Sequence, residues 1–179
     1  WRPGAVGRPA LARRFRFLDR VGVDVPPRTV GEVFMLPAGG PGSTYVYRGA
    51  QPRSRDGWES LGDLGWMDED GYLYLTDRSA DVILSGGANI YPAEVEAVRA
   101  DHPLIAEGVV VPRPDAVMGE VGVAVLVPAD AARPPSLEDV RAYLDDKLSR
   151  DKLPEAVRVV ATIPLTPMQK VDRRALAAA

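Results

Sequence analysis

The sequence predicts an α+β fold, in which a segment of strands and loops precedes a small domain with a short sheet flanked by helices. Three observations carry this prediction. The β-branched runs 105–111 and 121–127 are typical of buried strands. Apolar residues at spacings of 3, 4 and 4 over 137–148 predict an amphipathic helix. Before about residue 77, by contrast, the sequence holds only strand-like and loop-like segments.

The first segment is expected to contain short strands joined by turns. Acidic residues and Gly71 separate two apolar and aromatic runs within 67–75, which predicts a β-hairpin whose turn uses the positive φ of glycine. The other expected strands are 15–18, 32–36 and 44–47. Because about 80 residues of short strands rarely bury enough core alone, we expect a boundary within 76–80, dividing the chain into 1–78 and 79–179.

The second segment is expected to follow the order β–α–β–β–α–β. Strand 82–84 ends at Gly86 and Gly87, and a small-residue loop then leads to a helix that starts at Pro92 and reaches about residue 100. The two β-branched strands follow this helix, and the amphipathic helix follows them.

The second helix has a recognisable start. Ser136 is the expected N-cap, and Asp139, three residues later, is its expected capping-box partner. After this helix, the apolar residues of 157–163 predict a last strand.

Composition excludes several classes of protein. The 179 residues include no Cys and one His, which removes disulfides, thiolate sites, Cys nucleophiles and His-rich metal sites. A net charge of −3 and a pI near 5.3 predict no nucleic-acid partner. No apolar run approaches the roughly 20 residues of a membrane-spanning helix and no signal peptide is visible, so a cytoplasmic protein is expected. A start at Trp1 indicates a piece of a longer chain.

Three positions can carry chemistry, and each has a plainer alternative. Lys170, in a loop rich in Pro and Thr, can move a compact positive charge into a site, or it is an ordinary solvated lysine. Asp63, between two glycines, can accept two hydroxyl hydrogen bonds from a ligand, or it caps its own turn. The small-residue loop 85–89 lets a ligand approach the backbone, or it is only a turn.

The order and spacing of five motifs is more specific than any single residue. The motifs are Leu-Gly-Asp-Leu-Gly at 61–65, Asp-Glu-Asp-Gly-Tyr-Leu-Tyr at 68–74, Asp-Arg-Ser-Ala-Asp at 77–81, Ser-Gly-Gly-Ala-Asn-Ile-Tyr-Pro at 85–92 and the segment 164–174. Together they resemble the C-terminal third of adenylate-forming enzymes, which include acyl-CoA synthetases, adenylation domains of peptide synthetases and luciferases. The resemblance is strong over about 57–176 and extends more loosely to the start of the chain.

The resemblance implies a role for each candidate residue. Asp63 matches the Asp that holds the ribose hydroxyls of ATP and AMP, and Arg78 matches an Arg that contacts the nucleotide. Lys170 matches the catalytic lysine that enters the site for adenylation. Ala80 matches the hinge position, which is usually Asp or Lys in this family.

A loop of small residues has an implied role as well. Ser85, Gly86 and Gly87 match the loop that faces the site, beside the pantetheine path of CoA, during thioester formation. Two departures from the family pattern stand near the candidate residues. Leu61 replaces a usual Thr before Asp63, and Met168-Gln169 replaces a more usual Thr-Gly before Lys170.

For the whole chain, the resemblance implies that 1–78 is the C-terminal, β-rich part of a larger AMP-binding domain and that 79–179 is a mobile C-terminal lid domain. It implies an ATP-dependent carboxylate–CoA ligase that uses ATP, Mg²⁺, CoA and a small carboxylic acid. No residue of this chain is expected to bind the metal. The family's phosphate loop has no counterpart in these 179 residues, so the chain alone is expected to be inactive and to bind no cofactor tightly.

The branch of the family to which the chain is most similar can be suggested, and two alternatives to a CoA ligase remain open. Segments 45–50, 57–63 and 87–91 look most like fatty-acid and bile-acid CoA ligases, without showing which acid is activated. One alternative is an adenylation domain that delivers an acyl or amino acid to a carrier protein. The other is a non-catalytic binding module on the same fold, against which the presence of Lys170, Asp63 and Arg78 argues.

Overall fold

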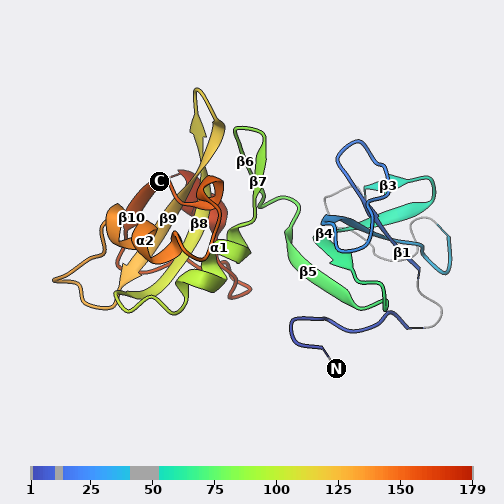
Figure 1. Ribbon diagram of the computed structural model, residues 1–179, viewed down its shortest axis with the longest axis horizontal. Helices are drawn as coiled ribbons and strands as arrows, with labels where there is room; N and C mark the ends of the chain where they lie inside the picture. The colour runs from blue at the N-terminus through green and yellow to red at the C-terminus, as the bar shows by residue number, and fades with distance from the viewer. Residues whose placement is uncertain (1, 11–13, 41–52, 179) are drawn as a thin grey trace. The chain divides into compact units, whose positions relative to one another are not determined.

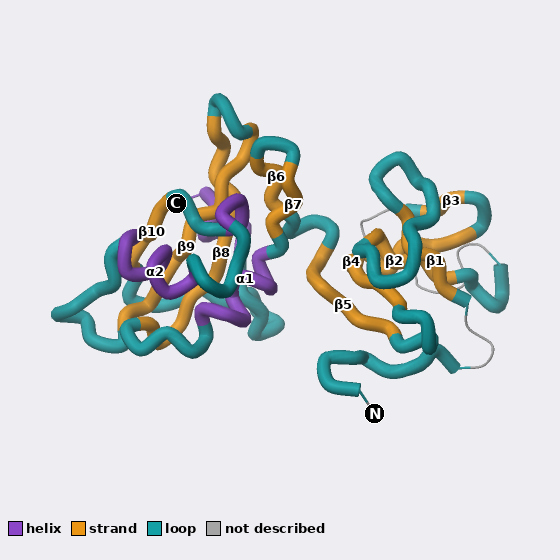
Figure 2. Tube along the Cα trace, in the orientation of Figure 1, coloured by secondary structure: helices purple, strands orange, loops and turns teal. Residues whose placement is uncertain are grey.

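A computed structural model describes residues 2–10, 14–40 and 53–178, arranged in two compact units, Trp1–Ala80 and Asp81–Ala179 (Figure 1). The strand expected at 44–47 lies outside the described residues. Sheet dominates both units, and the described helices all belong to the second (Figure 2). This arrangement confirms the predicted α+β class. Among the described residues, no helix is long and apolar enough to span a membrane.

The first unit is a five-stranded antiparallel sheet. Its strands are β1 (Phe15–Leu18), β2 (Gly31–Met35), β3 (Ser54–Arg55), β4 (Trp58–Met67) and β5 (Leu73–Arg78). They pair in the order β1-β2-β4-β3, with β5 also paired to β4. The predicted hairpin is β4–β5, and Gly71 in its turn has a φ of +78°. Asp68 stabilises the turn, because its Oδ1 accepts hydrogen bonds from the backbone N–H groups of Asp70 and Tyr72.

The second unit is built around a long central hairpin, β8–β9. Its elements are β6 (Ile83–Ser85), β7 (Ala88–Ile90), α1 (Pro92–Arg99), β8 (Ile105–Asp115), β9 (Gly119–Pro128), α2 (Leu137–Leu144), the 3-10 helix η1 (Arg150–Lys152), β10 (Ala156–Val159) and α3 (Arg173–Ala178). The sheet order is β10-β9-β6-β7, with β8 paired to β9. β10 runs parallel to β9, and the other pairs are antiparallel.

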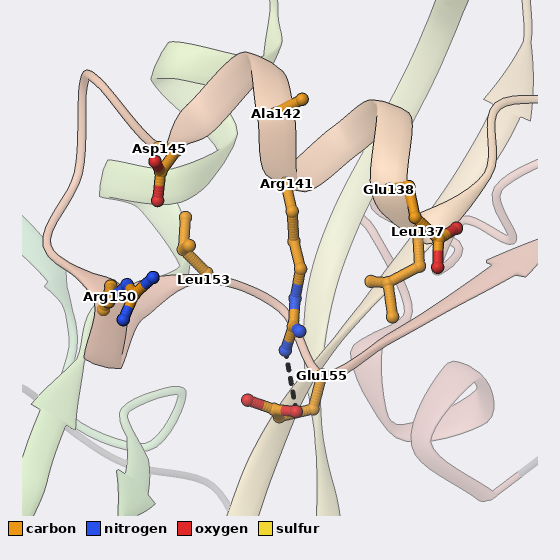
Figure 3. A pocket seen from close by; sticks show the side chains of 8 residues that line it. All are labelled: Leu137, Glu138, Arg141, Ala142, Asp145, Arg150, Leu153 and Glu155. Atoms are coloured by element: carbon orange, nitrogen blue, oxygen red, sulfur yellow. Dashed lines mark ion pairs between the residues drawn. The ribbon is translucent and has the colours of Figure 1, made fainter.

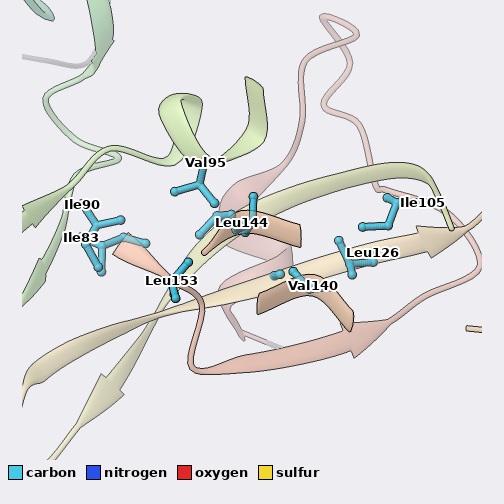
Figure 4. Packing of buried hydrophobic residues seen from close by; sticks show 10 residues of the cluster. Ile83, Ile90, Val95, Ile105, Leu126, Val140, Leu144 and Leu153 are labelled. Atoms are coloured by element: carbon cyan, nitrogen blue, oxygen red, sulfur yellow. The ribbon is translucent and has the colours of Figure 1, made fainter. Parts of the chain in front are cut away.

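Both faces of this sheet are covered, which explains why its central strands are continuously apolar. On one face Val110, Ala124 and Leu126 pack with α1 and α2 through Val95, Val140 and Leu144 (Figure 4). Their strand neighbours point to the opposite face, because successive side chains of a strand alternate. There Val109, Val111, Val123 and Val125 pack with Ile163 and with Leu176 of α3.

The predicted start of the second helix is confirmed. Ser136 Oγ accepts a hydrogen bond from the Asp139 N–H at 3.1 Å, and the Asp139 carboxylate accepts one from the Ser136 N–H at 2.9 Å. The last strand is shorter than expected, since β10 ends at Val159 while the buried Ile163 packs from an irregular segment.

One local prediction was wrong. The segment 85–89 was expected as a loop leading into the helix, but it is the tip of the β6–β7 hairpin, with Ser85 opposite Ala88. Gly86 and Gly87 both have positive φ, at 55° and 88°, which suits a two-residue hairpin turn. A second strand of this unit, β7, therefore precedes α1.

Candidate functional site

Asp63 and Arg78 face each other across the β4–β5 pair. They are direct partners in the register, and Arg78 Nε lies 3.1 Å from Asp63 Oδ1. Asp63 thus lies in a strand, and the turn-forming alternative does not apply. The Asp63 side chain is 27% exposed and that of Arg78 is 62% exposed, so both reach solvent.

Glycines shape the backbone on both sides of Asp63. Gly62 has a φ of +74°, and a Cβ at this position would meet no atom within 4 Å. Gly65 is required for packing, because a Cβ there would lie 2.3 Å from the carbonyl oxygen of Tyr74. The register of β4 and β5 also shifts between Leu64 and Gly65. The two glycines therefore leave open space before the carboxylate and allow close strand approach after it.

The chemistry of this pair fits a nucleotide. The Asp63 carboxylate can accept hydrogen bonds from ribose hydroxyls, and the exposed Arg78 guanidinium offers several donors to oxygen atoms. The described part of the chain has no group of three or more His, Cys, Asp or Glu side chains placed to hold a metal ion.

Lys170 lies exposed at the end of a tight turn in the second unit. An isolated bridge pairs Leu165 with Val171, and the Thr166 N–H donates to the Lys170 carbonyl at 2.7 Å. Gln169 donates to the Thr166 carbonyl at 2.9 Å and has a φ of +59°. Glycine adopts this conformation at no steric cost, so the structure explains why Gly is usual at this position in the family that the sequence resembles.

Ala80 is the last residue of the first unit and lies exposed in a turn. The residue before it is bound to the first unit, since Ser79 N–H donates to the Gly62 carbonyl at 3.0 Å and Ser79 Oγ accepts from Arg53 at 2.6 Å. The residue after it contacts the second unit, because Asp81 Oδ2 lies 3.4 Å from Arg173 Nε.

The three loop candidates occupy the tip of the β6–β7 hairpin. Ser85 is buried, whereas Gly86 and Gly87 are exposed. Gly86 N–H donates to the Met118 carbonyl at 2.9 Å, and a Cβ at this glycine would lie 2.5 Å from Met118 Cε. Ser85 and Met118 also line a hollow of about 330 Å³.

A larger hollow of about 550 Å³ lies beside α2 and contains none of the predicted site residues (Figure 3). Five of its eight lining residues are charged. Among them, Arg141 forms an ion pair with Glu155, with Arg141 Nη2 lying 2.7 Å from Glu155 Oε2. Arg141 Nε also donates to the Pro154 carbonyl. Arg141 and Glu155 are thus paired with each other, and we assign this hollow no ligand.

Sequence reasoning gave no role to Arg173, which opens α3 and contacts α1 and β8 in the structure. Its guanidinium grips the Glu96 carboxylate with two hydrogen bonds of 2.9 and 3.1 Å and donates to the Val110 carbonyl at 2.7 Å. The only sequence feature that could have drawn attention to Arg173 is its position three residues after Lys170. Its partner is 77 positions away, so no local pattern reveals the pair.

Comparison with known protein families finds a match within the second unit. Residues 94–170 match the family described as the AMP-binding enzyme C-terminal domain. The match covers most of the second unit and ends at Lys170.

Similar proteins extend the comparison to nearly the whole chain. The chain is 38% identical to a fatty acid–[acyl-carrier-protein] ligase, ScoC, from Streptomyces coeruleorubidus, over 96% of this chain and 33% of the relative. It is 36% identical to a 2-succinylbenzoate–CoA ligase from Bacillus cereus, over 97% of this chain and 35% of the relative. The chain thus spans about a third of the length of these curated relatives.

Solved structures give the same result. The o-succinylbenzoate CoA synthetase MenE from Bacillus subtilis, in complex with its acyl-adenylate intermediate, superposes with a TM-score of 0.82 at 33% identity, over 98% of this chain and 36% of that one. The amide bond synthetase McbA from Marinactinospora thermotolerans superposes with a TM-score of 0.79 at 36% identity, over 98% of this chain and 36% of that one. The comparisons support a C-terminal domain of adenylate-forming CoA or acyl-carrier-protein ligases, and they do not confirm the narrower fatty-acid and bile-acid branch.

Proposed function

We propose that this chain is part of an ATP-dependent carboxylate–CoA ligase. A carboxylate oxygen of the substrate attacks the α-phosphorus of ATP and releases pyrophosphate, and the thiol of CoA then attacks the acyl carbon of the acyl-adenylate and releases AMP. The observation that carries the proposal is the placement of Lys170, exposed on a hydrogen-bonded turn at the end of the matched AMP-binding C-terminal domain.

Each candidate residue takes one task in this reaction. The positive charge of Lys170 stabilises the anionic α-phosphate and the attacking carboxylate in the first step. Asp63 accepts the ribose hydroxyls, and Arg78 donates to the nucleotide. Mg²⁺, when bound with ATP, neutralises phosphate charge, and this chain's described residues are not assigned to it.

The second step uses another part of the same domain. We assign Ser85, Gly86 and Gly87 to the pantetheine path of CoA, because the glycine turn has no side chain to block a narrow ligand. We assign 1–78 to the β-rich end of a larger AMP-binding domain, 79–179 to a mobile lid and Ala80 to the hinge. Rotation about Ala80 would present Lys170 in the first step and the glycine turn in the second.

The acceptor has one specific alternative. Similarity to a fatty acid–[acyl-carrier-protein] ligase, at 38% identity, favours delivery of the acyl group to a carrier protein instead of CoA. We also propose the class of acid that is activated. Segments 45–50, 57–63 and 87–91 resemble those of fatty-acid and bile-acid CoA ligases, which favours a fatty or bile acid as the substrate. A cytoplasmic location is proposed together with the use of ATP and CoA, and cell fractionation tests it.

The test uses the complete protein that contains this chain, purified and supplied with ATP, Mg²⁺ and a panel of fatty acids, bile acids and 2-succinylbenzoate. We expect acid-dependent pyrophosphate exchange, followed by thioester formation with CoA. Transfer to a carrier protein but not to CoA would select the alternative, and no exchange with any acid would contradict the proposal. The 179-residue chain alone is expected to show no exchange.

Lys170→Ala tests the division between the two steps. Pyrophosphate exchange should fall by about 100-fold or more, since removal of one charge-stabilising group costs rates of that order. Conversion of supplied acyl-AMP to acyl-CoA should continue near the wild-type rate, because the charge acts in the first transition state only. Lys147→Ala removes a surface lysine of the same domain and should change neither step. Equal losses in both steps would refute this role of Lys170.

A further inference from the structure

The contacts of Arg173 join the start of the second unit to the turn that carries Lys170. Arg173 opens α3, three residues after Lys170. Its Nη1 and Nη2 bind the two carboxylate oxygens of Glu96 on α1, and Nη1 also donates to the Val110 carbonyl on β8. Its Nε lies 3.4 Å from Oδ2 of Asp81, the first residue after the proposed hinge.

Burial and geometry make this cluster stronger than an ordinary surface ion pair. The side chains of Arg173 and Glu96 are 21% and 19% exposed, and that of Asp81 is 31% exposed. Glu96 Oε1 also accepts the Val110 N–H at 2.7 Å, so the carboxylate is bound on more than one side. A planar guanidinium held by a two-pronged contact fixes direction as well as distance.

We propose that Arg173 is a positioning residue, which locks the 165–171 turn and the post-hinge residue Asp81 into one rigid body so that hinge rotation delivers Lys170 to a defined place. This inference rests on the proposed function of Lys170. The physical reason is the placement of Arg173 at the base of the turn: Lys170 extends from the turn, and α3, which Arg173 opens, follows it immediately. A small tilt at this base displaces the ammonium group, and reaction rates are sensitive to such displacement.

The variant that tests the proposal is Arg173→Lys in the complete protein. Lysine keeps the charge beside Glu96 but loses the two-pronged grip and the fixed direction toward Val110 and Asp81. Arg141→Lys is the matched control. Arg141 also pairs with a glutamate and donates to a backbone carbonyl in the same unit, but it lies on α2, away from the Lys170 turn.

Two readouts separate positioning from simple support of the fold. Arg173→Lys should slow pyrophosphate exchange on the order of ten- to hundredfold while leaving conversion of supplied acyl-AMP near the wild-type rate. Independently of activity, hydrogen exchange at the Thr166 and Gln169 amides should accelerate, because both donate within the turn. Arg141→Lys should alter neither the exchange of these amides nor the ratio of the two steps.

Each outcome bears on the proposal. The proposal would be overturned if Arg173→Lys kept the wild-type rate of pyrophosphate exchange and the wild-type amide protection of the turn. Equal loss of both reaction steps would overturn it as well. If Arg173→Lys does not fold, Asp81→Asn is used, since it weakens only the contact with the post-hinge residue, and the same split of the two steps is expected. If Lys170→Ala itself leaves adenylation unchanged, the proposed function of Lys170 fails, and the amide readout still decides whether Arg173 holds the turn.

Discussion

At the scale of single residues, the Asp63–Arg78 pair has the properties of a ligand contact more than those of a stabilising one. Both side chains reach solvent, and exposed ion pairs contribute only about 0–1 kcal/mol to folding. A carboxylate that is aligned by a strand, with open space before it at Gly62, is well prepared to accept hydroxyl groups.

Asp63→Ala should therefore weaken nucleotide binding without unfolding the protein. A hydrogen bond to a charged group contributes about 1.5–3 kcal/mol, so ATP affinity should fall roughly ten- to hundredfold. Titration calorimetry of the complete protein with ATP measures this. Asp24→Ala, which breaks another exposed ion pair of the same sheet unit, with Arg16, should leave ATP affinity unchanged. Unchanged affinity in Asp63→Ala would remove the ribose from this site.

At the scale of elements, the capping box of α2 is the clearest link between a sequence signal and a stabilising contact. The backbone hydrogen bond from Ser136, and then its hydroxyl, lower the pKa of Asp139. A carboxyl whose pKa is lowered in the folded state adds stability above its ordinary pKa and loses it as the pH falls through the folded value. The capping box should thus be complete at neutral pH and weaken below about pH 3.8.

Ser136→Ala should lower the free energy of unfolding by about 1 kcal/mol at pH 7, because an unsatisfied N–H is left at the helix start. Ser149→Ala is the matched control: Ser149 is also an N-cap, of η1, but its side chain makes no capping hydrogen bond. Urea unfolding of the chain at pH 7 and pH 3 measures the effect. The difference between Ser136→Ala and the wild type should shrink at pH 3, and a loss of equal size in both serine variants would contradict the capping role.

The sequence predicted the elements whose signals are local. β-branched runs indicated β8 and β9, and the Ser136–Asp139 spacing indicated the start of α2. The strand β7 was missed because its three residues, Ala88–Ile90, are too short for periodicity and gain their pairing from β6. Ile163 was included in the last predicted strand because it is apolar, like a buried strand residue. In the structure it is buried by packing against the face of the sheet that Val109 and Val125 line, without pairing in a strand.

At the scale of the whole molecule, the candidate site was predictable only where a motif carried it. Asp63, Arg78 and Lys170 stand in recognisable motifs, whereas the contact of Arg173 with Glu96 joins residues 77 positions apart and depends on the folded second unit. The boundary at Ala80 has a physical basis that the sequence does not contain. Hydrogen bonds hold Ser79 to the first unit, and an ion pair holds Asp81 to the second.

We propose Ala80 as the hinge between the two units. Proline fixes φ near −65° and removes an N–H, whereas glycine widens the accessible φ range. Ala80→Pro should lock one orientation, so that the complete protein performs one of the two steps and fails at the other, while Ala80→Gly should retain both. The test measures both steps, as pyrophosphate exchange and as conversion of supplied acyl-AMP. Only variants that keep the wild-type melting temperature are compared. A folded Ala80→Pro protein that retains both steps would place the pivot elsewhere, because a fixed backbone at the true hinge cannot present Lys170 and the Gly86-Gly87 turn in succession.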